Sequence, residues 1–314
     1  MIITVSIVQG ALEVGVIYAL VALALFLSYS ILNIADMTTD GCFVLGCAVS
    51  ATVCLAGHPY LALFAAIAAG AGAGFITAFL QTRLGVPSIL AGIITNTGLY
   101  TINLLAMGFT SNISLFKCDT IFSIAKDHMG NLPVIGSWYK LIVALIITVL
   151  VAVLLILFMG TRLGMSIRAT GDNTDMVRAS SINPVFTITV GLCVANAMTA
   201  LSGAVIGQYQ KSCDINLGTG MVVIGLASLI IGETLIGKKG IGRWVFAVIF
   251  GSVVYRFIIA IALRFNVPAE SLKLVSAVIV AVAIALPAMK RGLALQKQKK
   301  AAMRRKRDGG AGIC

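Results

Sequence analysis

Three polar side chains stand within a long apolar stretch at about residues 86–109: Asn96, Thr97 and Asn103. Residues seven apart share one face of a helix, so the two asparagines face the same way. Amide groups, and a hydroxyl group without a base beside it, can form hydrogen bonds with a polar molecule. Hydrogen bonding is therefore the chemistry that these residues offer. Two interpretations remain open: these groups line the route of a polar solute, or they join neighbouring helices.

The longest polar segment between apolar stretches runs from Arg162 to Asn183 and combines arginines with aspartates. Gly171, Asp172 and Asn173 form a turn signal that separates a basic segment from a short helical one. Charged residues of this kind belong outside a membrane, where they can meet a soluble partner. We therefore predict that residues 171–182 form a coupling element whose short helix docks on such a partner. A solvated surface loop is the alternative.

No cluster in the sequence has the spacing of a catalytic or metal site. The seven cysteines are scattered without a C-x-x-C or Cys/His pattern, so we expect no metal. Residues 232–239 come close to a phosphate-binding loop, but Lys239 stands where a serine or threonine must hold magnesium, and an apolar helix precedes the segment. We expect neither an enzyme nor a bound cofactor. Any ATP must be bound by a separate subunit.

Composition places these residues in a membrane protein. Hydrophobic residues make up 59% and charged residues 11% of the chain, whereas about a quarter of a soluble domain is charged. The apolar runs are continuous rather than alternating, which predicts helices and excludes a barrel. We expect an all-α, polytopic membrane domain over residues 1–289 and a basic cytoplasmic tail over residues 290–314. About nine transmembrane helices are predicted, at 4–31, 38–56, 60–80, 86–109, 138–160, 184–209, 217–236, 243–263 and 270–288.

A glycine pattern, GxxV[LI]GxA, occurs in residues 41–48 and again in residues 220–227. Applying the offset between the two copies moves the first four predicted helices onto the last four and leaves the fifth without a counterpart. Because one helix separates the two sets of four, the second half is inverted in the membrane relative to the first. Two inverted repeats with glycine-interrupted helices in matching positions are typical of transporters, and the interruptions point to the translocation route. Regular helix spacing alone is the alternative explanation. The glycines that we assign to the route are Gly41, Gly46, Gly220 and Gly225.

The basic tail decides the predicted orientation. Lysine and arginine favour the cytoplasmic side of a membrane, and they are dense from Lys290 to Arg307 but almost evenly divided among the loops. The C-terminus is therefore expected inside, and an odd number of helices puts the N-terminus outside. The tail is expected to contact anionic lipid. It has no aromatic residues to stack on bases, so we expect no nucleic-acid partner.

The polar segment after residue 161 has the pattern RLGxxxRAxGxNxxxxRxSxIN. It closely resembles the main cytoplasmic loop of permease subunits in ATP-binding cassette (ABC) importers of the branched-chain amino acid and simple-sugar families. In those permeases a short helix docks on the ATPase subunit. The resemblance implies that the coupling residues of this chain are Arg168, Gly171, Asp172, Asn173 and Arg178.

Further segments resemble branched-chain amino acid permeases over most of the chain: residues 15–51, VPSILAGIITNTGLYTINLLAMG at 86–108 and LGTGMVVIGLASLIIGETL at 217–235. The sequence departs from the branched-chain type at Thr38-Thr39-Asp40-Gly41, where Ala-His-Gly is expected. It is more similar to a less characterised permease branch associated with the uptake of aromatic or other amino acids.

The resemblance implies an importer in a bacterial plasma membrane. Its expected partners are an ABC ATPase inside, a solute-binding lipoprotein outside, and a second copy or a paralogue of the permease. The expected activity is alternating-access transport of a small polar solute, most simply an amino acid. Sugar or nucleoside transport by the same kind of permease stays open. So does an ion-coupled secondary transporter, which needs a buried acid near the midplane, with Glu13 as the candidate.

Overall fold

A computed structural model describes residues 5–129, 135–238 and 240–264, together with 274, 278 and 281. Helices dominate this part of the chain, as predicted. A π-helical segment, η1, extends the first helix over Phe26–Ile31. The α-helices are α1 (Val5–Leu25), α2 (Thr39–Leu55), α3 (Pro59–Thr82), α4 (Ser88–Ala106), α5 (Ile121–Met129), α6 (Ile135–Gly160), α7 (Arg162–Asp172), α8 (Thr174–Ala179), α9 (Pro184–Gln210), α10 (Met221–Ile236) and α11 (Ile241–Arg264).

The predicted polytopic helical membrane fold is confirmed. Six helices of the described part are long and apolar enough to cross a membrane: α1 with η1, α3, α4, α6, α9 and α11. Two further apolar helices, α2 and α10, are shorter. These eight helices match the first eight predicted stretches. The ninth stretch, 270–288, and the basic tail, 290–314, lie outside the described residues, so the count of nine stays a prediction.

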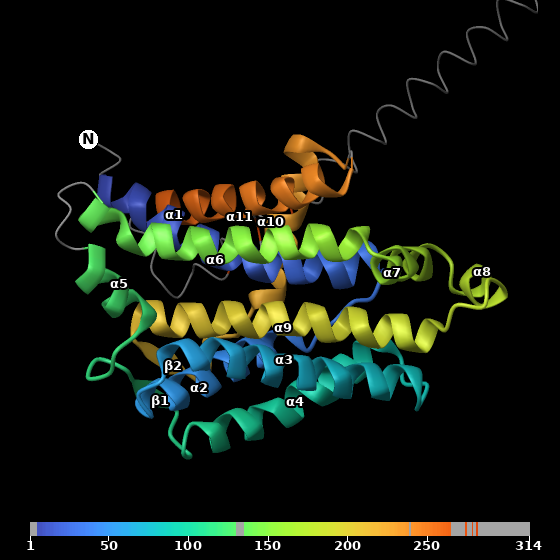
Figure 1. The fold of residues 1–314 in the computed structure, drawn as a ribbon, viewed down its shortest axis with the longest axis horizontal. Coiled ribbons are helices and arrows are strands. Elements are labelled where there is room, and N and C mark those ends of the chain that lie inside the picture. The colour runs from blue at the N-terminus through green and yellow to red at the C-terminus, as the bar shows by residue number, and fades with distance from the viewer. Residues whose placement is uncertain are drawn as a thin grey trace, which may run out of the picture.

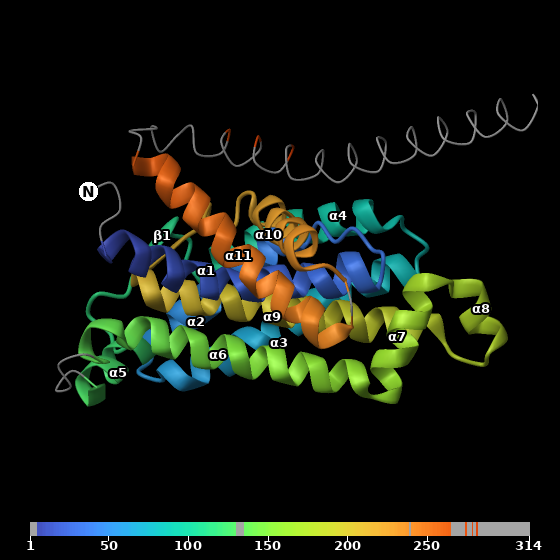
Figure 2. The same cartoon turned by 90° about the horizontal axis from the view of Figure 1, so that it is seen from above.

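Helices α1 and α9 form the middle of the bundle and run in opposite directions, while α4 and α6 lie on opposite sides of it (Figure 1 and Figure 2). Helices α2 and α3 pack on α9 and on each other, and α10 and α11 pack in the same way on α1. Exchanging α1 with α9, α2 with α10 and α3 with α11 therefore preserves the packing. This pattern agrees with the predicted inverted repeats, whose fourth pair involves residues outside the described part.

Helices α2 and α10 are short because both begin inside the bundle. The backbone N–H groups of Gly220 and Val222, at the start of α10, donate to the carboxylate of Asp40 in the first turn of α2. From this meeting point α2 runs toward the end of the bundle that carries α5, and α10 runs toward the end that carries α7 (Figure 1). Helix α2 is reached through residues 32–38 and α10 through residues 215–220, and we call the first of these connections the strap.

Small residues allow the central helices to approach closely. A β-carbon at Gly203 of α9 would overlap the carbonyl oxygen of Phe43 in α2, and one at Gly232 of α10 would overlap that of Ala247 in α11. Such contacts are how helices associate in lipid, where the hydrophobic effect between helices is absent. All side chains from Val16 to Leu27 of α1 and η1 are buried. The core is therefore built on α1 and its neighbours.

Local signals set the helix ends near the predicted polar segment. The Asn183 side chain accepts a hydrogen bond from the Val185 N–H (3.0 Å) at the start of α9, and Pro184 fills the first turn, where a missing N–H costs nothing. At the other end of α9, a short antiparallel sheet of β1 (Asn112–Ser114) and β2 (Ser212–Asp214) ties two connections together. The sequence analysis did not predict this sheet.

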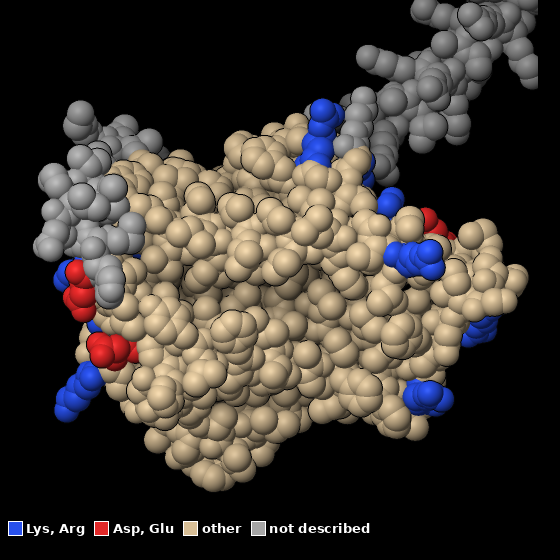
Figure 3. Space-filling model, in the orientation of Figure 1, with Lys and Arg blue, Asp and Glu red and all other residues tan. Residues whose placement is uncertain are grey.

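Charged side chains lie toward the two ends of the bundle. On the face seen in Figure 3 they form two groups, one beside α5 and the other toward α7, α8 and the connection before α11, with an uncharged zone between them. A zone free of exposed charge is what a lipid environment requires. The chain is thus a multi-pass membrane protein, and which end faces the cytoplasm remains a prediction.

Candidate functional site

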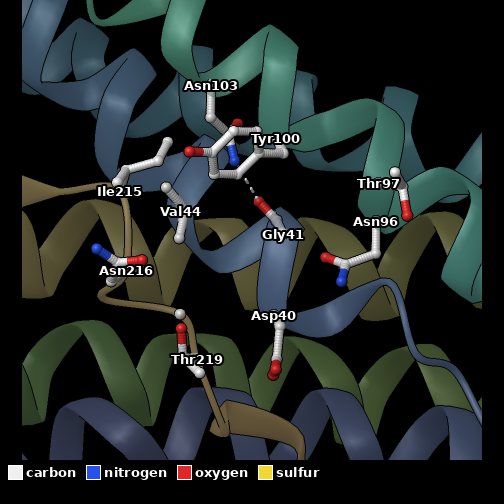
Figure 4. Close-up of a pocket in the computed structure, with 11 residues that line it drawn as sticks. Asp40, Gly41, Val44, Asn96, Thr97, Tyr100, Asn103, Ile215, Asn216 and Thr219 are labelled. Atoms are coloured by element: carbon white, nitrogen blue, oxygen red, sulfur yellow. Dashed lines mark hydrogen bonds between the residues drawn. The ribbon is translucent and has the colours of Figure 1, made fainter. Parts of the chain in front are cut away.

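A polar pocket of about 250 Å³ opens where α2 begins, between α2, α4 and the connection into α10. It lies beside the meeting point of the two short helices, and it is lined from both halves of the chain (Figure 4). Its lining residues are Asp40, Gly41, Val44, Asn96, Thr97, Tyr100, Asn103, Ile215, Asn216, Gly218 and Thr219.

The two predicted asparagines meet in this pocket. Asn103 is buried, and its Nδ2 donates to the carbonyl oxygen of Gly41 at 3.0 Å. The Oδ1 of Asn103 has no hydrogen-bond partner in the described structure. Asn96, about two turns earlier on α4, is half-buried, with its Oδ1 beside Gly41. Asn103 therefore both joins α4 to α2 and offers an acceptor to the pocket.

Asp40 is a site residue that the sequence analysis missed. Its Oδ2 accepts from the Gly220 N–H at 3.0 Å and its Oδ1 from the Val222 N–H at 2.9 Å. A carboxylate at a helix N-terminus is stabilised by the partial positive charge of that end. The signal for it was present in the sequence, because Asp40 directly precedes the first repeated glycine and lies in the stretch that departs from the branched-chain pattern.

Several polar groups of the pocket face outward. Thr97, Tyr100, Asn216 and Thr219 are exposed. The Thr97 hydroxyl donates to the Ile93 carbonyl oxygen of its own helix at 2.9 Å, which leaves it as an acceptor. Polar groups at this depth are unfavourable in lipid and are expected to face a cavity or another protein surface.

The four predicted glycines take different positions. Gly41 lines the pocket, and Gly220 begins α10 with φ +88°, a backbone conformation that favours glycine. Gly46 lies against the Ala200 backbone of α9, and Gly225 lies against Leu25 and Val21 of α1. The structure thus brings Gly41 and Gly220 to the site, whereas Gly46 and Gly225 sit at helix contacts away from it.

The predicted docking element projects beyond the bundle at one end (Figure 1). Its turn lies at Asn173, which ends α7 and accepts from the Asp175 and Met176 N–H groups, both at 3.0 Å, to begin α8. Gly171 and Asp172 belong to the last turn of α7, and the short helix that follows the turn is α8, Thr174–Ala179. Asparagine is a strong N-cap, and its side chain sets this division. Of the predicted coupling residues, Arg168, Asp172, Asn173 and Arg178 are exposed.

The strap connects the docking element to the pocket. A β-carbon at Gly171 would overlap the carbonyl oxygen of Ile31, so the last turn of α7 lies directly on the start of the strap. Farther along the strap, Asp36 is buried; its Oδ2 accepts from the Asn196 Nδ2 of α9 at 2.7 Å and its Oδ1 from the Thr38 N–H at 2.9 Å. The next residues enter α2 and reach Asp40.

Glu13, the acid considered for ion-coupled transport, lies elsewhere. It is buried in α1, where its carboxylate accepts from the Gln9 Nε2 and from the Tyr209 hydroxyl, each at 2.8 Å. It is not among the residues that line the pocket.

A family model described as "Branched-chain amino acid transport system / permease component" matches residues 7–286. The chain belongs to this permease family. The permease is therefore the membrane-spanning subunit of an ABC importer, in agreement with the resemblance seen in the sequence. Membership also implies that it works with partner subunits, an ATPase among them.

Two relatives and one solved structure extend this finding. The permease is 33% identical to the tyrosine transport system permease protein of Clostridioides difficile, over 85% of this chain and 86% of the relative. It is 31% identical to the uncharacterized protein RP368 of Rickettsia prowazekii, over 89% and 97%. Its fold is similar to a chain of PsaBC from Streptococcus pneumoniae in complex with Fab, with a TM-score of 0.50, 16% identity and coverage of 88% and 89%.

Proposed function

We propose that the permease imports an amino acid with an aromatic side chain, tyrosine being the first to test, and that the polar pocket at the start of α2 is part of its route. The observation that carries this proposal is the meeting of two short helices from opposite halves of the chain beside a buried Asn103 Oδ1 that has no hydrogen-bond partner in the described structure. Interrupted helices at a central cavity are the usual solute site of transporters built from inverted repeats. The substrate class rests on the tyrosine permease relative.

Size and lining favour a small polar solute. The pocket volume of about 250 Å³ lies below the range of drug-sized sites, roughly 300–1,000 Å³. Amide and hydroxyl groups surround it, and the Tyr100 ring, 55% exposed, offers a face against which an aromatic side chain can stack.

A second permease copy or a paralogue would cover the outward-facing polar groups. Thr97, Asn216 and Thr219 are exposed, and a protein surface there would shield them from lipid. In this arrangement the two pockets face a shared, water-filled route. The binding lipoprotein delivers its solute at the end that carries β1 and α5, and the assembly sits in a bacterial plasma membrane.

The ATPase docks on α7 and α8 at the opposite end. Closing of the ATPase moves α8, α7 pushes on Ile31 at the end of η1, and the strap that follows shifts the start of α2 with Asp40. The π-helical η1 directly before the strap supports this proposal, since π-helical turns recur at functional sites and make a weaker, more adaptable turn. The two halves of the bundle then open the pocket alternately to each side.

Competition identifies the substrate class. The measurement is the uptake of labelled tyrosine by vesicles that contain the permease, its ATPase and its binding protein. Unlabelled phenylalanine, leucine, ribose or a nucleoside is added as a competitor in separate samples. Inhibition by phenylalanine and not by ribose or the nucleoside supports the proposal. Uptake of the sugar or nucleoside in place of tyrosine would replace it with the corresponding ABC permease function, and uptake that follows an ion gradient without ATP would replace it with secondary transport.

A further inference from the structure

Asp40 is the one acidic or basic side chain among the residues that line the pocket. Its neighbours there are glycines, apolar residues, amides, hydroxyls and the Tyr100 ring. An ionised carboxylate at this depth is costly unless something compensates its charge. The question that the pocket raises is what that compensation is.

No basic side chain supplies it within the described part of the chain, where the single salt bridge joins Lys238 and Glu233. The two N–H groups at the start of α10 hold the carboxylate instead, at 3.0 and 2.9 Å. They fix its orientation. A carboxylate has about four acceptor positions, so each oxygen keeps capacity for another donor. Asp40 is therefore oriented and only partly satisfied.

A second acceptor in the same pocket also lacks a donor. Asn103 is 1% exposed, and its Oδ1 has no hydrogen-bond partner although its Nδ2 is bonded to Gly41. Buried polar atoms in proteins are nearly always hydrogen-bonded, and an exception calls for a ligand or water. A cavity that presents an unpaired amide oxygen and a partly satisfied carboxylate suits a molecule that brings several N–H donors and a positive charge.

On the proposed transport function, we propose that Asp40 is the receptor for the protonated amine of the substrate, with the Asn103 Oδ1 as a separate acceptor in the same pocket. A primary ammonium carries three donors and one positive charge, so it fills free acceptor positions of the carboxylate and balances its charge. A hydroxyl group of a sugar or nucleoside can donate hydrogen bonds to these acceptors, but it does not compensate the negative charge of the Asp40 carboxylate. The pocket thus selects primary amines, amino acids included. It does so at the very residues, Thr38–Gly41, where the sequence departs from the branched-chain pattern.

Thermal unfolding of the purified permease–ATPase complex, without binding protein, tests this assignment. Three probes separate the two charged groups of the substrate: tyrosine, tyramine, which lacks the carboxylate, and 3-(4-hydroxyphenyl)propionate, which lacks the amine. Tyrosine and tyramine should stabilise the wild-type complex in a concentration-dependent manner. The acid should not. Asp40→Asn should weaken binding of both amines roughly 30-fold or more, the usual effect of removing one partner of a buried charge pair.

Two further variants separate the lost charge from a general defect. Asp127→Asn removes a charge from the exposed surface of α5 and should leave both affinities unchanged. Asp40→Glu keeps the charge and should restore part of the amine binding even where Asp40→Asn alters the start of α10. Retention of the ATPase by each variant checks its assembly.

Three results would overturn the proposal: wild-type complex stabilised equally by the acid probe, wild-type complex stabilised by neither amine, or undiminished amine binding by Asp40→Asn. The transport assay keeps this proposal separate from the proposed function. If vesicles accumulate tyrosine and Asp40→Asn accumulates it equally well, the function stands and the role of Asp40 falls. If no vesicles accumulate an amino acid, the function itself falls.

Discussion

Gly171 lies so close to the carbonyl oxygen of Ile31 that any side chain at this position would overlap the strap. The contact joins the last turn of α7 to the last residue of η1, and through the strap to Asp40. The docking element is therefore in direct contact, through α7, with the segment that leads into α2 and the pocket.

Gly171→Ala should therefore separate α7 from the strap and uncouple the two. We expect a loss of about 1–3 kcal/mol in stability, as for other overpacked contacts, and solute uptake that falls more than ATP hydrolysis does. The ratio of solute transported to ATP hydrolysed in vesicles measures this. Gly160→Ala, at a position with open space, is the matched control. An unchanged ratio in Gly171→Ala would show that force does not pass through this contact.

A second prediction concerns the docking helix. Asn173→Ala removes the N-cap of α8 and should destabilise that helix by about 1 kcal/mol. Arg178→Glu reverses a charge that is exposed on α8. Each change should lower the amount of ATPase that copurifies with the permease, and the pair together should abolish coupled uptake. Lys299→Glu and Lys300→Glu in the basic tail serve as charge controls. If the double variant on α8 retains both the ATPase and transport, the helix is a surface feature and the docking site lies elsewhere.

A third prediction separates lining residues from packing residues on α4. Asn96→Leu should reduce uptake about five- to tenfold while the complex still assembles, because it removes a pocket amide that makes no hydrogen bond within the described structure. Asn103→Leu should also cost about 1–3 kcal/mol of stability, since it removes a buried hydrogen bond that joins α4 to α2. Thr97→Val should change little, because its hydroxyl proton is already bonded to Ile93. Full uptake with leucine at both asparagine positions would make them packing residues.

The fourth prediction is the orientation in the membrane. In a variant without its native cysteines, Asn112→Cys and Thr174→Cys place exposed thiols at opposite ends of the bundle. An impermeant maleimide added to intact cells should label the first and not the second, since the N-terminus is expected outside and α8 inside. The reverse labelling would invert the assignment, and it would move the ATPase site away from α7 and α8.

Sequence reasoning found the elements that depend on local or periodic signals. Long apolar runs identified the spans because each must cross the same thickness of lipid. Asn96 and Asn103 were placed on one face because helical spacing fixes the direction of residues seven apart, and both reach the pocket. The turn signal at residues 171–173 is also local, and α8 begins directly after it, at Thr174.

What sequence reasoning missed depends on contacts between distant segments. Asp40 is separated from Gly220 and Val222 by most of the chain, so nothing local shows that its carboxylate begins a helix of the other half. The partnership of Asp36 with Asn196 is equally remote. The repeat links these segments, because it aligns Gly41 with Gly220 and predicts matching short helices near the centre, but it does not show that the Asp40 carboxylate bonds to the second copy.

Chemical modification of the pocket tests the central claim, that it is the route of the substrate, most directly. Thr219→Cys places a thiol at the exposed edge of the pocket, and Phe75→Cys places one on the exposed apolar face of α3. The measurement is ATP-driven uptake of labelled tyrosine in vesicles before and after treatment with a bulky thiol reagent. The account predicts that modification of Thr219→Cys blocks uptake, that excess tyrosine slows the modification, and that modified Phe75→Cys transports normally. Full uptake by completely modified Thr219→Cys would contradict it.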